Sequence, residues 1–130
     1  MTEVKDGLKY TKEHEWAKIE GDIATVGITD YAQNALTDIV FVELPEEGKE
    51  VSQSKSFATL ESVKSVSDVY AALSGKIIEV NKELENSPDL INKEPYEGGW
   101  IAKIKMSDLK EADSLMDAES YKQYLEKEGH

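Results

Sequence analysis

The sequence is dominated by short segments in which apolar and polar residues alternate and which end at turn-forming residues. Residues 16–20 and 23–28 are two such segments, and Gly21-Asp22 separates them. Alternation fits a strand with one face on a core and the other in water, and a Gly-Asp pair between two such segments is typical of a tight hairpin. The pattern therefore predicts a core of paired strands.

Further segments of this kind follow along the chain. The segment 38–44 is rich in β-branched residues and ends at Pro45, which cannot continue a strand ladder. No Gly, Pro or Asn stands between segments 57–64 and 65–71, so composition does not mark the turn between them. We expect strands at residues 8–11, 16–20, 23–28, 38–44, 57–64, 65–71, 76–80 and 100–105.

Helical signals are sparser and gather near the C-terminus. Thr29 or Asp30 can cap a short helix that runs to residue 36, and Asn81 can start another. After Met106, Asp108 and Glu111 stand three residues apart, as in a capping box. Helical spacing then predicts one or two amphipathic helices in a segment of about residues 107–130, packed on the β core. The residues that carry this spacing are Tyr121, Tyr124 and Leu125.

Length and charge exclude several classes of function. The 130 residues suit one domain, residues 1–130, and the formal net charge is −12. Such an acidic chain repels phosphate backbones and anionic membranes, so we expect neither nucleic acid nor a membrane as partner. There is no cysteine, so disulfides and thiolate chemistry are absent, and any redox chemistry requires an attached group.

The N-terminus shows no secretory or transit signal, and no apolar run approaches the roughly 18 residues of a membrane span. We therefore expect a cytoplasmic protein of bacterial type, with the mature form of an organellar protein as the alternative.

Lys64 lies where two alternating segments meet, in the run Thr59-Leu60-Glu61-Ser62-Val63-Lys64-Ser65-Val66-Ser67-Asp68. If the two segments form a hairpin, Lys64 stands at its tip with the ammonium group in water. An enzyme that acylates a lysine needs such exposure, because its active site must surround the amine. From the residues alone, Lys64 is only slightly favoured over Lys55 or Lys76, and an ordinary solvated lysine is the competing interpretation.

A resemblance to a known family changes this balance. Glu61-Ser62-Val63-Lys64 resembles the lipoylation site of the glycine cleavage system H protein family, and further blocks match that family in order over about residues 7–125. These blocks are His14-Glu15-Trp16, Val26-Gly27-Ile28-Thr29-Asp30-Tyr31-Ala32-Gln33, Asp38-Ile39-Val40-Phe41-Val42-Glu43-Leu44-Pro45, Ser74-Gly75, Glu79-Val80-Asn81, Pro88, Leu90-Ile91-Asn92, Pro95-Tyr96 and Gly98-Gly99-Trp100.

Two positions depart from the family pattern. Thr37 stands where the family usually has Gly, and Ala72 stands where it usually has Pro. Gly relieves strain at positive φ and Pro fixes φ, so each departure bears on a local turn and not on Lys64.

The resemblance implies a mainly β fold of the barrel-sandwich hybrid type, like that of lipoyl and biotinyl carriers, with short helices and a C-terminal helical segment. It implies a non-catalytic carrier in glycine catabolism and one-carbon metabolism, with lipoate on Lys64 as a swinging arm of roughly 14 Å reach. It also implies three partner enzymes and a lipoyl-attaching enzyme. The three are the PLP-dependent glycine decarboxylase, from which the arm takes the aminomethyl group, the aminomethyltransferase, and the dihydrolipoyl dehydrogenase that reoxidises the arm. We expect a monomer, since several enzymes must reach the arm.

The same resemblance suggests roles for three acids. Glu15 and Asp68 would hold the cationic amine on the loaded arm, and Glu61 would help the attaching enzyme recognise the site; the alternative for each is an ordinary surface acid. No catalytic residue and no metal site are expected. His14 and His130 are the only histidines, so a structural or cleft-lining role is expected for His14.

Other carriers fit the residues less well. A biotinyl site usually has Met on both sides of its lysine, where this chain has Val63 and Ser65. A lipoyl domain of a two-oxo-acid dehydrogenase usually has Asp before the lysine and lacks the block His14-Glu15-Trp16. A further alternative is an H-like lipoyl protein that delivers lipoate to other enzymes or serves as an interaction module.

Overall fold

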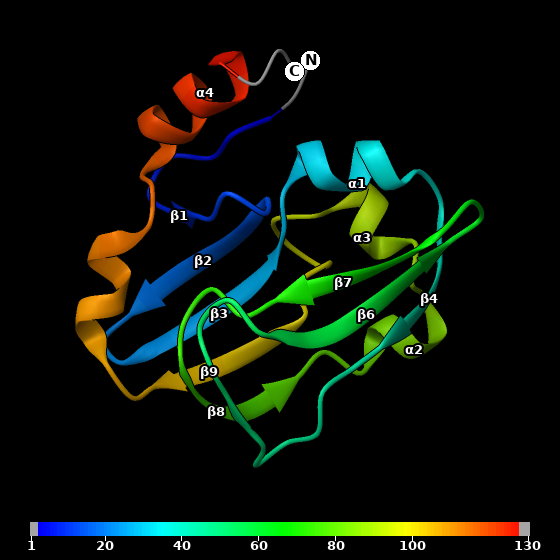
Figure 1. Ribbon diagram of the computed structural model, residues 1–130. Coiled ribbons are helices and arrows are strands. Elements are labelled where there is room, and N and C mark those ends of the chain that lie inside the picture. Colours follow the sequence, from blue (N-terminus) through cyan, green and yellow to red (C-terminus); the bar gives the residue numbers. More distant parts are fainter. Residues whose placement is uncertain (1–2, 128–130) are drawn as a thin grey trace.

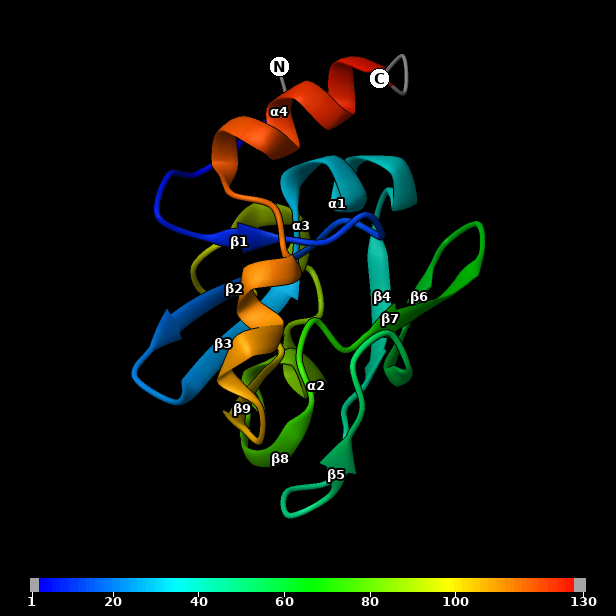
Figure 2. The ribbon, with the colours of Figure 1, turned by 60° about the vertical axis from the view of Figure 1, so that its left-hand side comes forward.

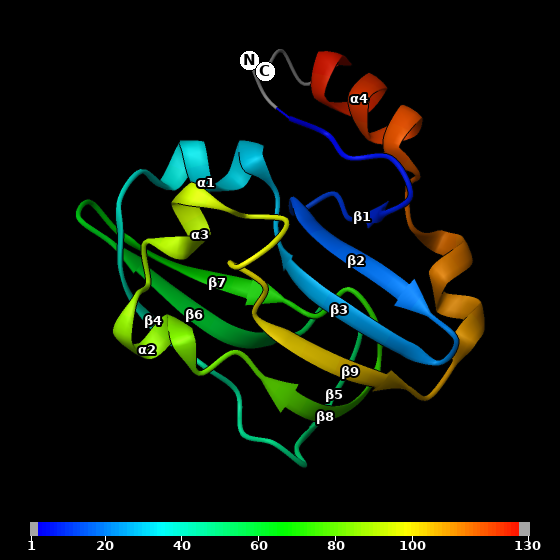
Figure 3. The same cartoon turned by 180° about the vertical axis from the view of Figure 1, so that it is seen from behind.

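The computed structural model describes residues 3–127, whose strands form two sheets (Figure 1). The larger sheet has six strands in the order β1-β2-β3-β9-β8-β5, and Figure 3 shows it from behind. Every neighbouring pair in it is antiparallel, so short turns suffice to join successive strands such as β2 and β3. The strands are β1 (Lys9–Tyr10), β2 (Glu15–Glu20), β3 (Ile23–Ile28), β9 (Ala102–Met106), β8 (Gly75–Val80) and β5 (Glu50–Val51).

The smaller sheet has three antiparallel strands in the order β4-β6-β7. They are β4 (Ile39–Glu43), β6 (Ser56–Ser62) and β7 (Val66–Tyr70), and the β6–β7 hairpin projects away from the rest of the molecule (Figures 1 and 2). The alternation of residues sets which face is inside: Val42 pairs with Leu60 and both are buried, whereas their neighbours Phe41 and Glu61 form the next, outer row.

The main core lies between the two sheets. Apolar side chains from both form one continuous cluster, in which Leu60 and Val69 come from the smaller sheet and Val26, Ile77 and Ile104 come from the larger one. Burial of such side chains is the main stabilising term of a two-layer β structure. The mainly β core predicted from the alternating segments is confirmed.

A second cluster joins the C-terminal helix α4 (Ala118–Lys127) to the edge of the larger sheet, and Figure 2 shows α4 lying over β1. The Tyr10 and Tyr121 rings stack with centroids 4.5 Å apart, and Trp16 and Leu125 are buried in the same cluster. Gly27 makes room for Trp16, because a Cβ at Gly27 would lie 2.8 Å from the indole ring. The expected packing of a C-terminal helix on the β core is confirmed.

Short helices complete the described chain. The helix α1 (Asp30–Leu36) has Thr29 as its N-cap, as expected, with the Thr29 hydroxyl accepting a hydrogen bond from the Ala32 N–H at 3.2 Å. The others are the single-turn helices α2 (Glu83–Asn86) and α3 (Leu90–Lys93) and the 3₁₀ helix η1 (Leu109–Ser114). The pattern did not predict α3, and a one-turn helix leaves too short a periodic signal to find.

The capping box expected at the start of η1 is wrong. Asp108 accepts a hydrogen bond from the Lys110 N–H at 3.0 Å, but Glu111 does not reach back to Asp108. Its carboxylate instead accepts hydrogen bonds from the Ser74 N–H at 2.7 Å and the Ser74 hydroxyl at 2.9 Å. Two donors from the loop before β8 thus replace the local partner, and they tie η1 to the larger sheet.

Candidate functional site

Lys64 lies at the tip of the β6–β7 hairpin, as predicted, and its side chain is exposed. The tip is closed by Ser62, whose N–H donates to the Ser65 carbonyl at 2.8 Å and whose hydroxyl oxygen accepts from the Ser65 N–H at 3.1 Å. A serine hydroxyl can thus stabilise a turn that contains no Gly, Pro or Asn. The ammonium group of Lys64 takes part in no ion pair within residues 3–127.

The base of this tip is anchored to the segment between α1 and β4. The Val63 N–H donates to the Asp38 carbonyl at 3.1 Å, which fixes the tip against the start of β4. Asn92 of α3 holds that same segment from the other side. Its amide donates to the Thr37 carbonyl at 2.8 Å, and its carbonyl oxygen accepts from the Ile39 N–H at 2.9 Å. The Asn92 side chain therefore bridges both neighbours of the residue that anchors the tip.

Thr37 has a backbone conformation that strongly favours glycine. Its φ is 65° and its ψ is −153°, a region essentially reserved for residues without a Cβ. This is the position at which the sequence departs from the expected Gly, so the departure places strain in the link between α1 and β4. At Ala72, the other departure, the residue is buried and its carbonyl accepts from the Gln53 side-chain amide at 3.1 Å.

The outer face of the smaller sheet carries two of the three acids singled out from the sequence. Glu61 pairs with Val66, and Asp68 pairs with Thr59 one row further from the tip. Asp68 is exposed and Glu61 is half-buried. The sequences of β4, β6 and β7 contain three acidic residues and no Lys or Arg, so Lys64 is the only cationic side chain on this hairpin.

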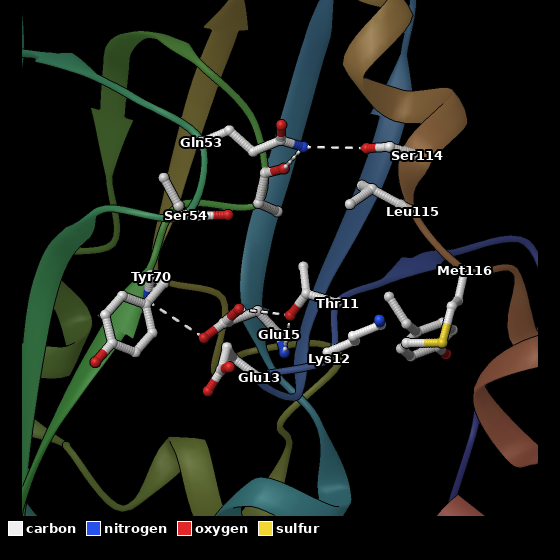
Figure 4. Close-up of a pocket in the computed structure, with 13 residues that line it drawn as sticks. Thr11, Lys12, Glu13, Glu15, Gln53, Ser54, Tyr70, Ser114, Leu115 and Met116 are labelled. Carbon is white, nitrogen blue, oxygen red and sulfur yellow. Dashed lines mark hydrogen bonds between the residues drawn. The ribbon is translucent and has the colours of Figure 1, made fainter. Parts of the chain in front are cut away.

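Glu15 lies in a different environment, in a pocket of about 320 Å³ near the opposite end of β7 (Figure 4). It is 3% exposed. One carboxylate oxygen accepts from the Thr11 hydroxyl at 2.5 Å, and the other accepts from the Tyr70 N–H at 3.2 Å. Burial raises the pKa of the Glu15 carboxyl from its ordinary 4.5 to about 7; the hydrogen bonds from Thr11 and Tyr70 oppose this, and the nearby Glu13 adds to it.

Strand β7 connects these two places. It begins at Val66, beside the Lys64 tip, and it ends at Tyr70, whose N–H reaches Glu15. Asp68 lies between them on the same strand. The structure therefore places Lys64, Glu61 and Asp68 on one hairpin, whereas Glu15 comes from β2 and meets only the far end of β7.

Sequence reasoning missed the partners that fix these residues. Thr11 and Tyr70 hold the Glu15 carboxylate, and Asn92 holds the segment that anchors the tip. Asn92 belongs to a block that carried the family resemblance, so that block was the available signal. No pattern in the sequence points to Thr11 or Tyr70, because their contacts join distant strands.

His14 takes part in a network around α4. Its Nδ1 lies 2.8 Å from the Tyr121 hydroxyl, which lies 2.9 Å from the Thr29 hydroxyl, and the His14 and Tyr31 rings are 4.4 Å apart. These contacts support the expected structural role. Within the part of the chain that the structure describes, no group of three or more His, Cys, Asp or Glu side chains could hold a metal ion. No helix among residues 3–127 has the length and apolar character needed to cross a bilayer.

Comparison with known proteins identifies the family. The family described as "Glycine cleavage H-protein" matches residues 8–128. The chain is 57% identical over 123 residues to a glycine cleavage system H protein of Halothermothrix orenii, which covers 95% of this chain and 96% of that protein. It is 52% identical over 122 residues to that of Staphylococcus carnosus, with 94% and 97% covered.

A solved structure supports the same assignment. The crystal structure of a glycine cleavage system H protein from Mycobacterium marinum superimposes with a TM-score of 0.85 at 38% identity, over 98% of this chain and all of the other. This similarity confirms the expected barrel-sandwich fold with a C-terminal helix. The chain belongs to the glycine cleavage H-protein family.

Proposed function

We propose that this chain is the lipoate-bearing carrier of a glycine cleavage system, with lipoate in amide linkage to Lys64. The observation that carries the proposal is the position of Lys64 at the tip of a projecting hairpin in a member of this family. The exposed ammonium group can enter the active site of an attaching enzyme without any rearrangement of the core. The chain, taken as one domain over residues 1–130, supplies the attachment point and docking surfaces and no catalytic group.

The local structure fits an acylated lysine. Amide formation removes the charge of Lys64, and this costs no ion pair among the described residues. Once attached, the dithiolane of lipoate supplies the sulfur chemistry by which the aminomethyl group of glycine is carried from the decarboxylase to the aminomethyltransferase. Dihydrolipoyl dehydrogenase is the third proposed partner. The bacterial relatives support the expectation of a cytoplasmic carrier.

We assign Glu15 and Asp68 to the site that holds the amine of the cargo. The five residues of β7 span roughly 13 Å from Val66 to Tyr70, which is comparable to the reach of roughly 14 Å expected for the arm. Asp68 lies along this path and Glu15 lies at its end. A cation beside the buried Glu15 would favour its ionised form, so Glu15 is suited to bind a protonated amine and to release it as the carboxyl becomes protonated.

The role of Glu15 and Asp68 can be tested without the complete enzyme system. The aminomethyl-loaded protein is incubated at neutral pH, and release of the cargo is followed by intact mass. Glu15→Gln and Asp68→Asn should each accelerate release, whereas Glu20→Gln, a change of an exposed acid on β2, should not. Equal release rates in all four proteins would remove this role.

The carrier function itself is tested by reconstitution with the other three enzymes. Exchange of CO₂ with the glycine carboxyl should require this chain in its lipoylated form, and Lys64→Arg should abolish it. If the lipoylated wild type supports no exchange, the chain is not a carrier for this reaction, and delivery of lipoate to other enzymes becomes the better explanation.

A further inference from the structure

Exposed apolar side chains gather around Lys64. Six large apolar residues are exposed among residues 3–127, and four of them lie at this end of the smaller sheet, with exposed fractions between 52% and 63%. We call these four the tip patch: Val40, Phe41, Val63 and Val66. The other two, Ile78 and Leu109, lie on β8 and η1, outside the smaller sheet.

Strand pairing places two residues of the tip patch, Phe41 and Val66, in one row near the end of the hairpin. Phe41 pairs with Glu61, and Glu61 pairs with Val66, so these three residues form one row across β4, β6 and β7. Val40 lies at the irregularity between Ile39 and Phe41, and Val63 directly precedes Lys64. A cluster of exposed apolar side chains at one end of a sheet is a typical mark of a binding surface.

The charged side chains within the three strands that carry the tip patch are all acidic. The row Phe41, Glu61, Val66 contains an acid at its centre, and the next row contains Glu43 and Asp68. No Lys or Arg occurs in the three strands, so acylation of Lys64 would leave the hairpin without a cationic side chain. Lys82 lines a hollow together with Phe41, and Glu43 and Glu85 line the same hollow. A partner that fits this surface is therefore apolar at its centre and basic at its rim.

The distance from the backbone to the reacting atom decides which partner must contact the tip patch. An enzyme that acylates Lys64 acts at Nζ, which lies within about 6 Å of the backbone, so its surface must cover the residues that flank the lysine. The enzymes that act later meet the end of an arm of roughly 14 Å, and they can do so without contact to these residues.

We propose that the tip patch is the docking surface of the enzyme that acylates Lys64. The proposal rests on the proposed function and deepens it. In the step concerned, an amide bond forms between Nζ and the carbonyl carbon of an acyl adenylate. The bond from that carbon to the phosphate oxygen breaks and AMP leaves. Nζ, which starts as an ammonium group, releases two protons to solvent, one before it attacks and one as the amide forms. The tip patch makes no bond in this step and acts by holding the two proteins together.

The test measures acylation of the complete apo protein by a purified lipoate-attaching ligase, with lipoate and ATP, followed by intact mass. Phe41→Ser and Val66→Ser should each lower kcat/KM by about tenfold, as expected when a central apolar contact is removed. The effect should appear as a higher KM at nearly unchanged kcat, because the contact serves docking. Added salt should raise KM for wild type, because the acidic residues around the tip patch draw a basic rim.

Matched variants separate docking from folding. Phe41→Leu keeps an apolar surface and should retain most of the rate, whereas Leu109→Ser and Ile78→Ser remove exposed apolar groups elsewhere and should acylate as wild type does. Unchanged acylation by the Phe41→Ser and Val66→Ser variants would overturn the proposal, and so would equal losses in the two control variants. The proposed function fails separately, if the wild-type chain itself is not acylated at Lys64.

Discussion

The Lys64 hairpin tip and the Glu15 pocket place charged side chains in opposite environments. Lys64 is exposed and is held by its backbone alone, through Ser62, Ser65 and the Val63–Asp38 contact. Glu15 is buried, both of its carboxylate oxygens accept hydrogen bonds, and its pKa is raised to about 7. The lysine proposed to carry lipoate is thus free of ion pairs among the described residues, whereas the acid proposed to bind the amine is fixed by hydrogen bonds and poorly solvated. The former adds little to stability, and the latter reduces it at neutral pH.

The largest expected effect concerns the pocket. Because the folded pKa of Glu15 lies above its ordinary value, the folded state binds the proton more tightly, and stability is lost as pH rises from about 4.5 to about 7. Glu15→Gln removes this loss and keeps a hydrogen-bond acceptor. As pH rises from about 5 to about 8, the free energy of unfolding of the variant should increase by about 2 to 3 kcal/mol relative to that of wild type. Denaturant unfolding at each pH measures this difference.

The control for this prediction is Asp68→Asn, which changes an exposed acid of the same proposed site. It should leave the wild-type dependence on pH in place. If Glu15→Gln and wild type keep a constant difference over this range, Glu15 does not titrate in the folded protein as its burial implies.

A smaller effect concerns the anchor of the tip. Asn92→Ala removes the acceptor for the Ile39 N–H and the donor to the Thr37 carbonyl, and should lower the free energy of unfolding by about 2 kcal/mol. Amide exchange at Val63 should quicken more than exchange at Ile104 in the core of the larger sheet. Asn86→Ala, a change of an exposed residue at the end of α2, is the control and should affect neither quantity. Uniform quickening at both amides would show that Asn92 has no specific link to the tip.

The smallest effect tests strain beside the same anchor. Thr37→Gly relieves an unfavourable combination of φ and ψ, and the larger conformational entropy that Gly loses on folding offsets part of this benefit. We therefore expect the free energy of unfolding, measured with denaturant, to rise by about 1 kcal/mol. Ala35→Gly, two residues earlier on the exposed side of α1, should instead lose about 0.5–1 kcal/mol. If both variants lose stability alike, Thr37 is not strained.

The hairpin tip and the Glu15 pocket also differ in how far they could be predicted from the sequence. The strands other than the two-residue β5, and the α1 cap at Thr29, follow from local alternation and capping chemistry, so they were predictable. The Lys64 hairpin was inferred only from the meeting of two alternating segments, because its turn contains no Gly, Pro or Asn. The surroundings of Glu15 were not predictable, because Thr11 and Tyr70 reach it from segments whose pairing depends on how the two sheets pack. The capping box predicted for Glu111 was wrong for a related reason. The local pattern pointed to Asp108 as its partner, but Glu111 binds Ser74, which is distant in the sequence and close only in the folded structure.

The attachment of lipoate at Lys64 is tested most directly by intact mass and peptide mapping of the protein from lipoate-replete cells. We expect a single lipoyl addition, on the peptide that contains Lys64, and its complete loss in Lys64→Arg. The thermal midpoint of that variant should match that of the unmodified wild type, since Lys64 is exposed at a turn. A lipoyl addition that persists in Lys64→Arg, or one that maps to Lys55 or Lys76, would contradict the assignment.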